Sequence, residues 1–271
     1  MTQTPAATRL AGTLLAVRDG SAGIEVFMVR RAREIDFIAG ALVFPGGKVD
    51  AADAAIVERG LGTGLAGLDD DDARARVAAL REAYEEAGIL VARDGGGSIV
   101  DAAHVDAAEA DRARVAAGEL DLAGFLEARG WRLATGEMAP FSRWITPRSA
   151  PKRFDTMFYL VQAPPGQDGS HDGTESIESR WIDAAEAVKA AEQGTLPIVF
   201  PTRMNLMRLA AFPTVAAALA GSGMDKVVPV EPFMQERPDG RWICIRDDAG
   251  YSITEMPVSK AFARPLAQGQ K

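Results

Sequence analysis

The 271-residue chain has the composition of a globular protein, with 47% hydrophobic and 25% charged residues, and is long enough to bury a sizeable core. Its net charge of −8 argues against non-specific binding to nucleic acid or membrane surfaces, and no apolar run is long enough to span a bilayer. Cys244 is the only cysteine, so an intramolecular disulfide is excluded and a cytoplasmic location is expected. With only His104 and His171, a histidine-rich zinc site is not expected.

The first strands are predicted before residue 50. Two apolar runs, 10–17 and 24–30, flank a Gly-containing turn, which predicts a β-hairpin. A third run, 41–44, predicts a strand that leads into Gly46 and Gly47. Because glycine accepts torsions that other residues avoid, the chain is expected to turn sharply at these two residues.

A long helix is predicted next. Residues 50–68 contain four glycines and no strong periodicity, which predicts a loop or a short helix. The run from Asp69 to Asp72 supplies N-cap candidates and favourable first-turn acids, and apolar side chains then recur at helical spacing as far as Ala87. Gly88 is placed to end this helix.

The later elements alternate irregularly between helices and strands, which predicts an α/β fold with a mixed sheet covered by helices. Helices are predicted at 105–117, 120–129, 184–193 and 201–220, and strands at 141–146, 154–161 and 179–182. A hairpin is predicted from 227–233 and 242–246 around a Pro-Asp-Gly turn, and the tail after residue 256 is expected to be loosely structured.

Three glutamates lie on one face of the long helix. Glu82, Glu85 and Glu86 are related by i, i+3 and i+4, so their like charges repel, and the helix dipole disfavours anions in its last turn. A bound cation explains this arrangement, and carboxylate oxygens suit Mg²⁺ or Mn²⁺. Magnesium sites of this kind commonly include substrate phosphates. A paired acid on a helix is more often a solvated face, so the cluster needs the nearby glycine turn to support it.

With that turn, the sequence resembles the Nudix hydrolases. Their box is Gly, five residues, Glu, seven residues, then Arg-Glu, a bulky aliphatic, any residue, Glu-Glu, any residue, Gly and a bulky aliphatic. The matching residues are Gly47, Arg81, Glu82, Glu85, Glu86, Gly88 and Ile89.

The resemblance implies a Nudix-type α/β/α sandwich in which Glu82, Glu85 and Glu86 bind Mg²⁺ or Mn²⁺. Arg81 is then expected to orient a carboxylate through a charge-assisted hydrogen bond. The implied reaction is in-line attack of metal-activated water on the phosphorus of a diphosphate linkage.

The box departs from the family pattern in three ways. Asp53 stands where the first glutamate is expected, and Ala83 replaces the bulky aliphatic. Twenty-seven residues, 54–80, separate Asp53 from Arg81 where the box has seven. An interrupted box of this kind resembles a subgroup that includes peroxisomal coenzyme A diphosphatases. The same order of motifs continues through 29–31, 37–40, 43–47, 144–147 and 151–156.

The resemblance suggests one Nudix domain over residues 8–222, with insertions at 54–80 and 100–130. The C-terminal hairpin and tail, 223–271, are expected to pack on that domain. A homodimer is plausible for the superfamily.

The leading substrate is coenzyme A or an acyl-coenzyme A, cleaved to 3′,5′-ADP and the phosphopantetheine part. The usual coenzyme A signature upstream of the box is not evident, so ADP-ribose or NADH remains an alternative, as does a non-catalytic module that senses a nucleotide. All three glutamates are present, which favours the enzyme. The chain ends without a peroxisomal Ser-Lys-Leu address.

A nucleotide-diphosphate substrate needs cations. Arginine clamps phosphate oxygens through two donors, and solvated strand-end charge is the alternative. The candidates for substrate binding are Arg30, Arg31, Arg33, Lys152 and Arg153, together with the backbone at Gly46 and Gly47.

Nudix enzymes commonly take a further carboxylate from a downstream loop. Glu175 and Glu178 are candidates: Glu175 for a catalytic role near the metal, and Glu178 for a structural one. Plain surface acids are the alternative for each.

Overall fold

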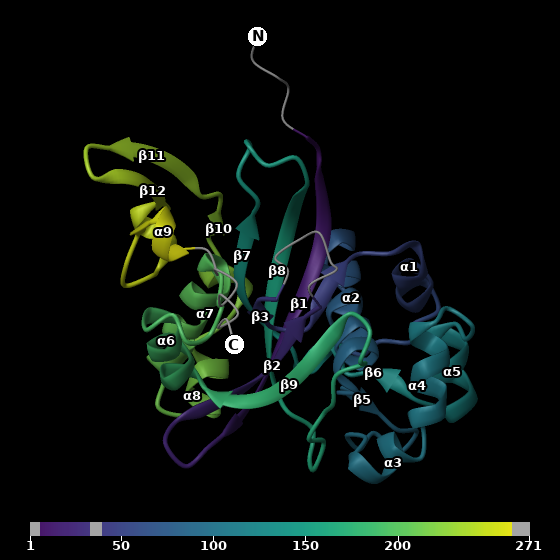
Figure 1. Ribbon diagram of the computed structural model, residues 1–271. Coiled ribbons are helices and arrows are strands. Elements are labelled where there is room, and N and C mark those ends of the chain that lie inside the picture. Colours follow the sequence, from purple (N-terminus) through teal and green to yellow (C-terminus); the bar gives the residue numbers. More distant parts are fainter. Residues whose placement is uncertain (1–5, 33–39, 262–271) are drawn as a thin grey trace.

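The computed structural model describes residues 6–32 and 40–261, in which a central eight-stranded sheet lies between two layers of helices (Figure 1). Six strands follow the order β10-β7-β8-β1-β2-β3, while β4 pairs with β1 and β9 pairs with β2. The sheet is mixed, because β1 runs parallel to β8 and antiparallel to β2. The predicted α/β class with a mixed sheet is confirmed. The strands are β1 (Thr8–Asp19), β2 (Ile24–Arg31), β3 (Leu42–Val43), β4 (Gly46–Lys48), β7 (Ala139–Ile145), β8 (Arg153–Gln162), β9 (Ser176–Asp183) and β10 (Pro229–Val230).

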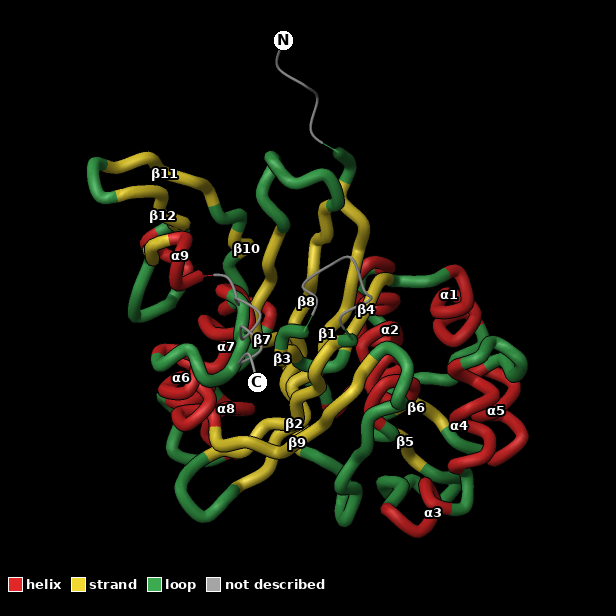
Figure 2. Tube along the Cα trace, in the orientation of Figure 1, coloured by secondary structure: helices red, strands yellow, loops and turns green. Residues whose placement is uncertain are grey.

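The sheet is covered on both faces, as the alternation along β1 shows. Leu14 and Ala16 belong to one hydrophobic core, whereas Leu15 and Val17 belong to the other, since successive side chains of a strand point to opposite faces. The first core lies under α2 and the helices beyond it, and the second under α6, α7 and α8 (Figure 2). The covering helices are α1 (Ala51–Glu58), α2 (Asp70–Ala87), α3 (Ala102–Asp106), α4 (Glu109–Ala116), α5 (Leu122–Arg129), α6 (Ala184–Glu192), α7 (Phe200–Ala210) and α8 (Val215–Ala220).

Helix α2 has the ends that the sequence predicts. The Asp69 side chain accepts a hydrogen bond from the Asp72 amide at 2.9 Å, and Gly88 ends the helix in the left-handed region with φ +65°. The helix packs closely on β1 at Gly12, where an added Cβ would lie 2.0 Å from the Ala75 carbonyl oxygen. This close approach holds the glutamate-bearing face of α2 beside β4, the strand that contains Gly46 and Gly47.

The predicted helix over 105–117 is wrong as one element. The chain forms α3 and α4 with a break at Ala107–Ala108, and the buried Ala108 carbonyl accepts a 3.4 Å hydrogen bond from the Tyr84 hydroxyl. Nothing in the Ala-rich sequence marks this break, because the residue that stabilises it lies on α2. The short strands β5 (Ala92–Arg93) and β6 (Arg132–Leu133) flank this helical segment and pair with each other.

The predicted helix over 201–220 is also two helices. Helix α7 ends at Ala210, and α8 begins after Thr214, whose side chain accepts a hydrogen bond from the Ala217 amide at 3.2 Å. Pro213 lies in the break and lacks the amide that a continuous helix needs.

The C-terminal hairpin forms around the predicted turn, but its first strand lies later in the chain than the predicted 227–233. Its strands are β11 (Phe233–Arg237) and β12 (Gly240–Cys244), whereas β10 leaves the hairpin and pairs with β7. Pro232 lies between β10 and β11 and cannot donate a ladder hydrogen bond.

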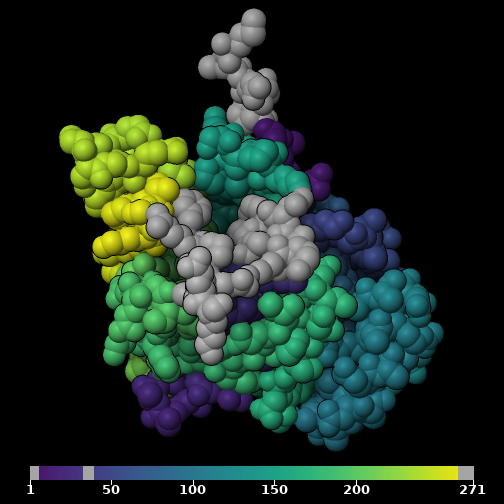
Figure 3. Space-filling model, viewed as in Figure 1, coloured from purple at the N-terminus to yellow at the C-terminus, as the bar shows by residue number. Residues whose placement is uncertain are grey.

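The tail predicted to be loosely structured forms β13 (Glu255–Pro257) and α9 (Val258–Ala261), and its remainder, 262–271, lies outside the described residues. Ile243, Met256 and Ala261 belong to the core beneath α6 and α7, and these elements lie at one side of the molecule (Figure 3). Across the described ranges, no helix has the length and apolarity needed to cross a membrane.

Candidate active site

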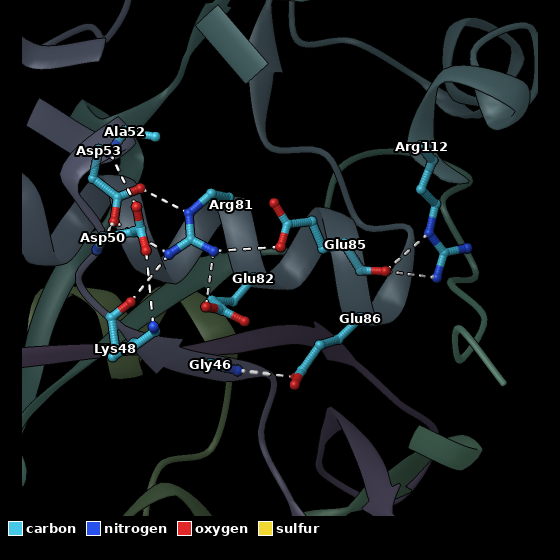
Figure 4. A network of polar contacts seen from close by, with 10 residues as sticks. All are labelled: Gly46, Lys48, Asp50, Ala52, Asp53, Arg81, Glu82, Glu85, Glu86 and Arg112. Carbon is cyan, nitrogen blue, oxygen red and sulfur yellow. Dashed lines mark hydrogen bonds and ion pairs between the residues drawn. The ribbon is translucent and has the colours of Figure 1, made fainter. Parts of the chain in front are cut away.

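The last two turns of α2 carry the glutamate cluster, Glu82, Glu85 and Glu86, beside strand β4 (Figure 4). The Glu82 and Glu85 side chains are 15% and 20% exposed, and Glu86 is 5% exposed. Burying three like charges side by side is unfavourable unless cations compensate them. The contacts of this cluster therefore decide what the site can bind.

Arg81 connects the cluster to the preceding helix. Its Nε donates to Asp53 Oδ1 at 2.8 Å and its Nη2 to Asp53 Oδ2 at 3.2 Å, while its Nη1 donates to Glu82 Oε1 at 2.8 Å and Glu85 Oε2 at 3.3 Å. Asp53 is fully buried and also accepts from the Asp50 amide at 2.7 Å, which caps α1. The aspartate in the place of the expected glutamate thus holds Arg81 in position.

Gly46 and Gly47 allow β4 to approach the cluster. The Gly46 amide donates to Glu86 Oε2 at 3.3 Å. A Cβ on Gly47 would lie 2.4 Å from Glu82 Oε1, well inside van der Waals contact. Gly46 and Gly47 were predicted to form a turn but belong to strand β4, and they are in direct contact with two of the three predicted metal ligands.

The protonation equilibria of the cluster reflect burial and repulsion. Burial, followed by repulsion from Glu82, raises the pKa of Glu86 to about 8. Burial is also the first cause that raises the pKa of Glu85, to about 7, although Arg81 opposes it. The pKa of Glu82 is raised by burial as well. The protein alone thus holds more negative charge here than it stabilises.

The donor set fits a hard divalent cation in its chemistry and charge. Carboxylate oxygens are the ligands that Mg²⁺ and Mn²⁺ prefer, and the glutamate cluster supplies six of them. No three Asp, Glu, His or Cys side chains of the described residues are already grouped to hold a metal ion. Figure 4 shows why: the Glu82 and Glu85 carboxylates face Arg81, whereas Glu86 faces Gly46. The ligand assignment stays a prediction.

Glu175 and Arg31 lie within electrostatic reach of the cluster. The charge of Glu175 contributes to the raised pKa of both Glu82 and Glu86, and Arg31 opposes the rise at Glu86. The Arg31 Nε is buried and has no hydrogen-bond partner within the part of the chain that the structure describes. The site roles of both residues stay predictions.

The loop before β9 is held by Asp172. Its carboxylate accepts hydrogen bonds from the amides of Glu175 at 3.0 Å and Ser176 at 2.8 Å. These bonds and that from Thr174 lower the pKa of Asp172 in spite of its burial. The sequence analysis did not identify Asp172, because its role depends on the folded loop.

The other predicted cations have different surroundings. Arg30 Nε donates to Glu178 Oε2 at 2.6 Å, which agrees with a structural role for Glu178. Arg153 donates to the Thr146 and Ala6 carbonyls and pairs with Glu231 at 2.8 Å; none of these partners belongs to the glutamate cluster. Lys152 adjoins Arg153 and is exposed. Substrate binding by Lys152 and Arg153 stays a prediction, and Arg33 lies outside the described residues.

A second residue that the sequence does not reveal is Arg112 of α4. Its Nε and Nη2 donate to the Glu85 carbonyl at 3.3 and 3.2 Å, and its Nη2 also donates to the Ser170 carbonyl at 2.8 Å. No motif marks Arg112, because it comes from the helical segment outside the Nudix-like box.

The chain is similar to proteins named as Nudix hydrolases. No family model matches the chain. Nudix hydrolase 7 of Caenorhabditis elegans is 28% identical over 184 residues, which are 68% of this chain and 55% of that protein, so the match spans about half the length of this curated relative. A crystal structure of a Nudix hydrolase from Alicyclobacillus acidocaldarius is 35% identical, with a TM-score of 0.73, and the match covers 80% of this chain and 98% of that one.

Proposed function

The chain belongs to the Nudix hydrolase family, and we propose that it hydrolyses a diphosphate linkage in coenzyme A or an acyl-coenzyme A. The observation that carries the chemistry is the glutamate cluster, in which Arg81 bonds Glu82 and Glu85 while Glu86 accepts from the Gly46 amide of β4. Bound Mg²⁺ or Mn²⁺ would neutralise phosphate oxygens and supply an activated water for attack on phosphorus. The products would be 3′,5′-ADP and the phosphopantetheine or acyl-phosphopantetheine part.

The protein groups have separate tasks in this proposal. Glu82, Glu85 and Glu86 would hold the cation. Arg81 keeps the Glu82 and Glu85 carboxylates in place through its hydrogen bonds. The charge of Arg31 opposes the rise in the Glu86 pKa, and its buried Nε, which has no partner among the described residues, would donate to a phosphate oxygen.

Glu175 is our candidate for the base that takes a proton from the attacking water. Its charge already acts on both Glu82 and Glu86. The Asp172 hydrogen bonds fix the backbone on either side of it, which limits the positions that its carboxylate can reach.

Support for a coenzyme A substrate comes from the order of sequence motifs around the interrupted box. The 54–80 stretch of that box contains residues 54–58 of α1, the connection 59–69 and residues 70–80 of α2. The helix face that carries the glutamates thus continues directly from the inserted residues.

The test is hydrolysis of coenzyme A, an acyl-coenzyme A, ADP-ribose and NADH by purified protein with Mg²⁺ or Mn²⁺. Glu85→Gln removes one cluster carboxylate, and Glu119→Gln, an exposed glutamate on the surface, is the matched control. Turnover of coenzyme A species that is lost only in Glu85→Gln supports the proposal.

Two other outcomes would redirect the assignment. Turnover of ADP-ribose or NADH alone would keep the chemistry and reject the coenzyme A substrate. Metal-dependent binding of one compound without turnover of any would indicate the non-catalytic sensor. The homodimer and the cytoplasmic location stay predictions, for which sedimentation and cell fractionation are the direct measurements.

A further inference from the structure

We propose that Arg112 is a positioning residue that fastens the Glu175 loop to the end of α2, so that the helical segment 102–129 acts on the active site. The proposal rests on the proposed hydrolase function for its kinetic part only. It assigns a task to a segment that the Nudix-like box does not include.

Arg112 is buried at the point where three parts of the chain meet. It is 4% exposed and lies on α4. Its guanidinium donates to the carbonyl of Glu85 on α2 and to both the carbonyl and the hydroxyl of Ser170, at 2.8 and 3.1 Å. Figure 4 shows it reaching the backbone of Glu85 from the side opposite Arg81.

The charge of Arg112 suits this end of the helix. The last carbonyls of α2 carry the negative end of the helix dipole, and the last turn contains no basic residue of its own. Among the described residues, the one carboxylate in ion-pair contact with Arg112 is that of Glu109, at 3.3 Å, and the Glu109 side chain is 61% exposed. The buried guanidinium therefore depends mainly on backbone carbonyls for compensation.

Gly88 makes room for this contact. A Cβ at Gly88 would lie 2.8 Å from the Arg112 Nη1. The glycine that ends α2 with φ +65° thus also admits the guanidinium.

The loop that Arg112 holds is the one that carries Glu175. The Ser170 amide donates to the Ala87 carbonyl of α2 at 2.8 Å, and the Ser170 carbonyl accepts from Arg112 of α4, which in turn donates to the Glu85 carbonyl of α2. Two residues later, Asp172 organises the turn to Glu175. Loss of Arg112 would leave Ser170 held to α2 by its amide alone, and Glu175 would then be attached mainly through Asp172 and β9.

The test compares Arg112→Gln, Arg112→Lys and the control Arg114→Gln, which changes an exposed arginine on the same helix. Hydrogen exchange over residues 168–176 reports the loop without any activity measurement. We expect faster exchange there in Arg112→Gln, an intermediate rate in Arg112→Lys, and no change in Arg114→Gln. A lysine keeps the charge but cannot bridge the Glu85 and Ser170 carbonyls in the same fork.

The kinetic arm uses a double-mutant cycle with Glu175→Gln. We expect Arg112→Gln to lower kcat by about 10- to 100-fold with KM little changed, and to have a much smaller effect when Glu175 is already glutamine. The proposal would be overturned if Arg112→Gln lowered kcat equally with glutamate and with glutamine at position 175. It would also be overturned if the loop in Arg112→Gln exchanged as slowly as in the wild-type protein. If the unchanged protein hydrolyses nothing, the proposed function fails, and the exchange arm still decides whether Arg112 holds the loop. Arg112→Lys serves if Arg112→Gln does not fold.

Discussion

Asp53 and Arg81 lie 28 positions apart in the chain, yet the Arg81 Nε donates to Asp53 Oδ1 over 2.8 Å, and the Asp53 side chain is 1% exposed. This pair joins α1 to α2 across the interrupted box. It also keeps the guanidinium where its other nitrogens reach Glu82 and Glu85.

The first prediction concerns this buried pair. Asp53→Ala leaves a guanidinium that is 11% exposed without its principal partner, and we expect it to lower the free energy of unfolding by about 3 kcal/mol. Activity should fall as well, because Arg81 loses its orientation. Denaturant unfolding checks the stability, with Asp106→Asn, an exposed aspartate, as the control. An unchanged midpoint would mean that Asp53 does not hold Arg81 in solution.

The second prediction tests the close approach at Gly47. In Gly47→Ala the new methyl group must displace the Glu82 carboxylate, which lies 2.4 Å from its position. We expect about 100-fold lower kcat/KM, because Glu82 leaves its place in the cluster. Gly95→Ala is the matched control, since its nearest neighbour is the Gly130 carbonyl oxygen at 3.8 Å. Equal activity of the two variants would show that the site tolerates a shifted Glu82.

The third prediction links metal, pH and stability. The pKa of Glu85, about 7, and that of Glu86, about 8, lie above the ordinary value of 4.5. A raised carboxyl pKa means that the folded state binds the proton more tightly than the unfolded state, so the metal-free protein loses stability as the pH rises from about 4.5 to 8. Mg²⁺ binds the deprotonated carboxylates, so the stabilisation of the protein by Mg²⁺ should increase as the pH rises.

We therefore expect Mg²⁺ to raise Tm clearly at pH 8 and hardly at pH 5. Thermal unfolding with and without Mg²⁺ at both pH values is the measurement, with Ca²⁺ as a comparison ion. The pH dependence of the Mg²⁺ effect on Tm should weaken in Glu86→Gln, because this variant has no carboxylate at position 86. A larger Mg²⁺ effect at pH 5 would contradict the assignment.

The fourth prediction separates two acids of one segment. Glu175→Gln removes a charge that acts on the cluster, and we expect kcat to fall by about 100-fold if this carboxylate takes the proton. Glu178→Gln weakens the contacts to Arg30 and Arg180, so its effect should fall mainly on stability. Steady-state kinetics and unfolding of both variants check the difference. A larger kinetic loss in Glu178→Gln would exchange the two roles.

Local periodicity explains what was predictable. Helix α2 and its ends at Asp69 and Gly88 follow from short-range capping and helical spacing, and they were confirmed. The breaks between α3 and α4 and between α7 and α8 were missed. Pro213 is a local signal for the second break. The first depends on the hydrogen bond from the Tyr84 hydroxyl to the Ala108 carbonyl, which no local pattern indicates.

The sequence by itself determined that Glu82, Glu85 and Glu86 share a helix face, because this depends on residues close together in the chain. It predicted a turn at Gly46 and Gly47, which instead form strand β4 through pairing with the distant β1. Only the tertiary structure decided which groups meet that face. The partners of Arg81, the approach of Glu175 and the contact of Arg112 with the end of α2 join residues far apart in sequence. Such contacts depend on how the sheet and helices pack, and that packing is set by the whole core rather than by any short stretch.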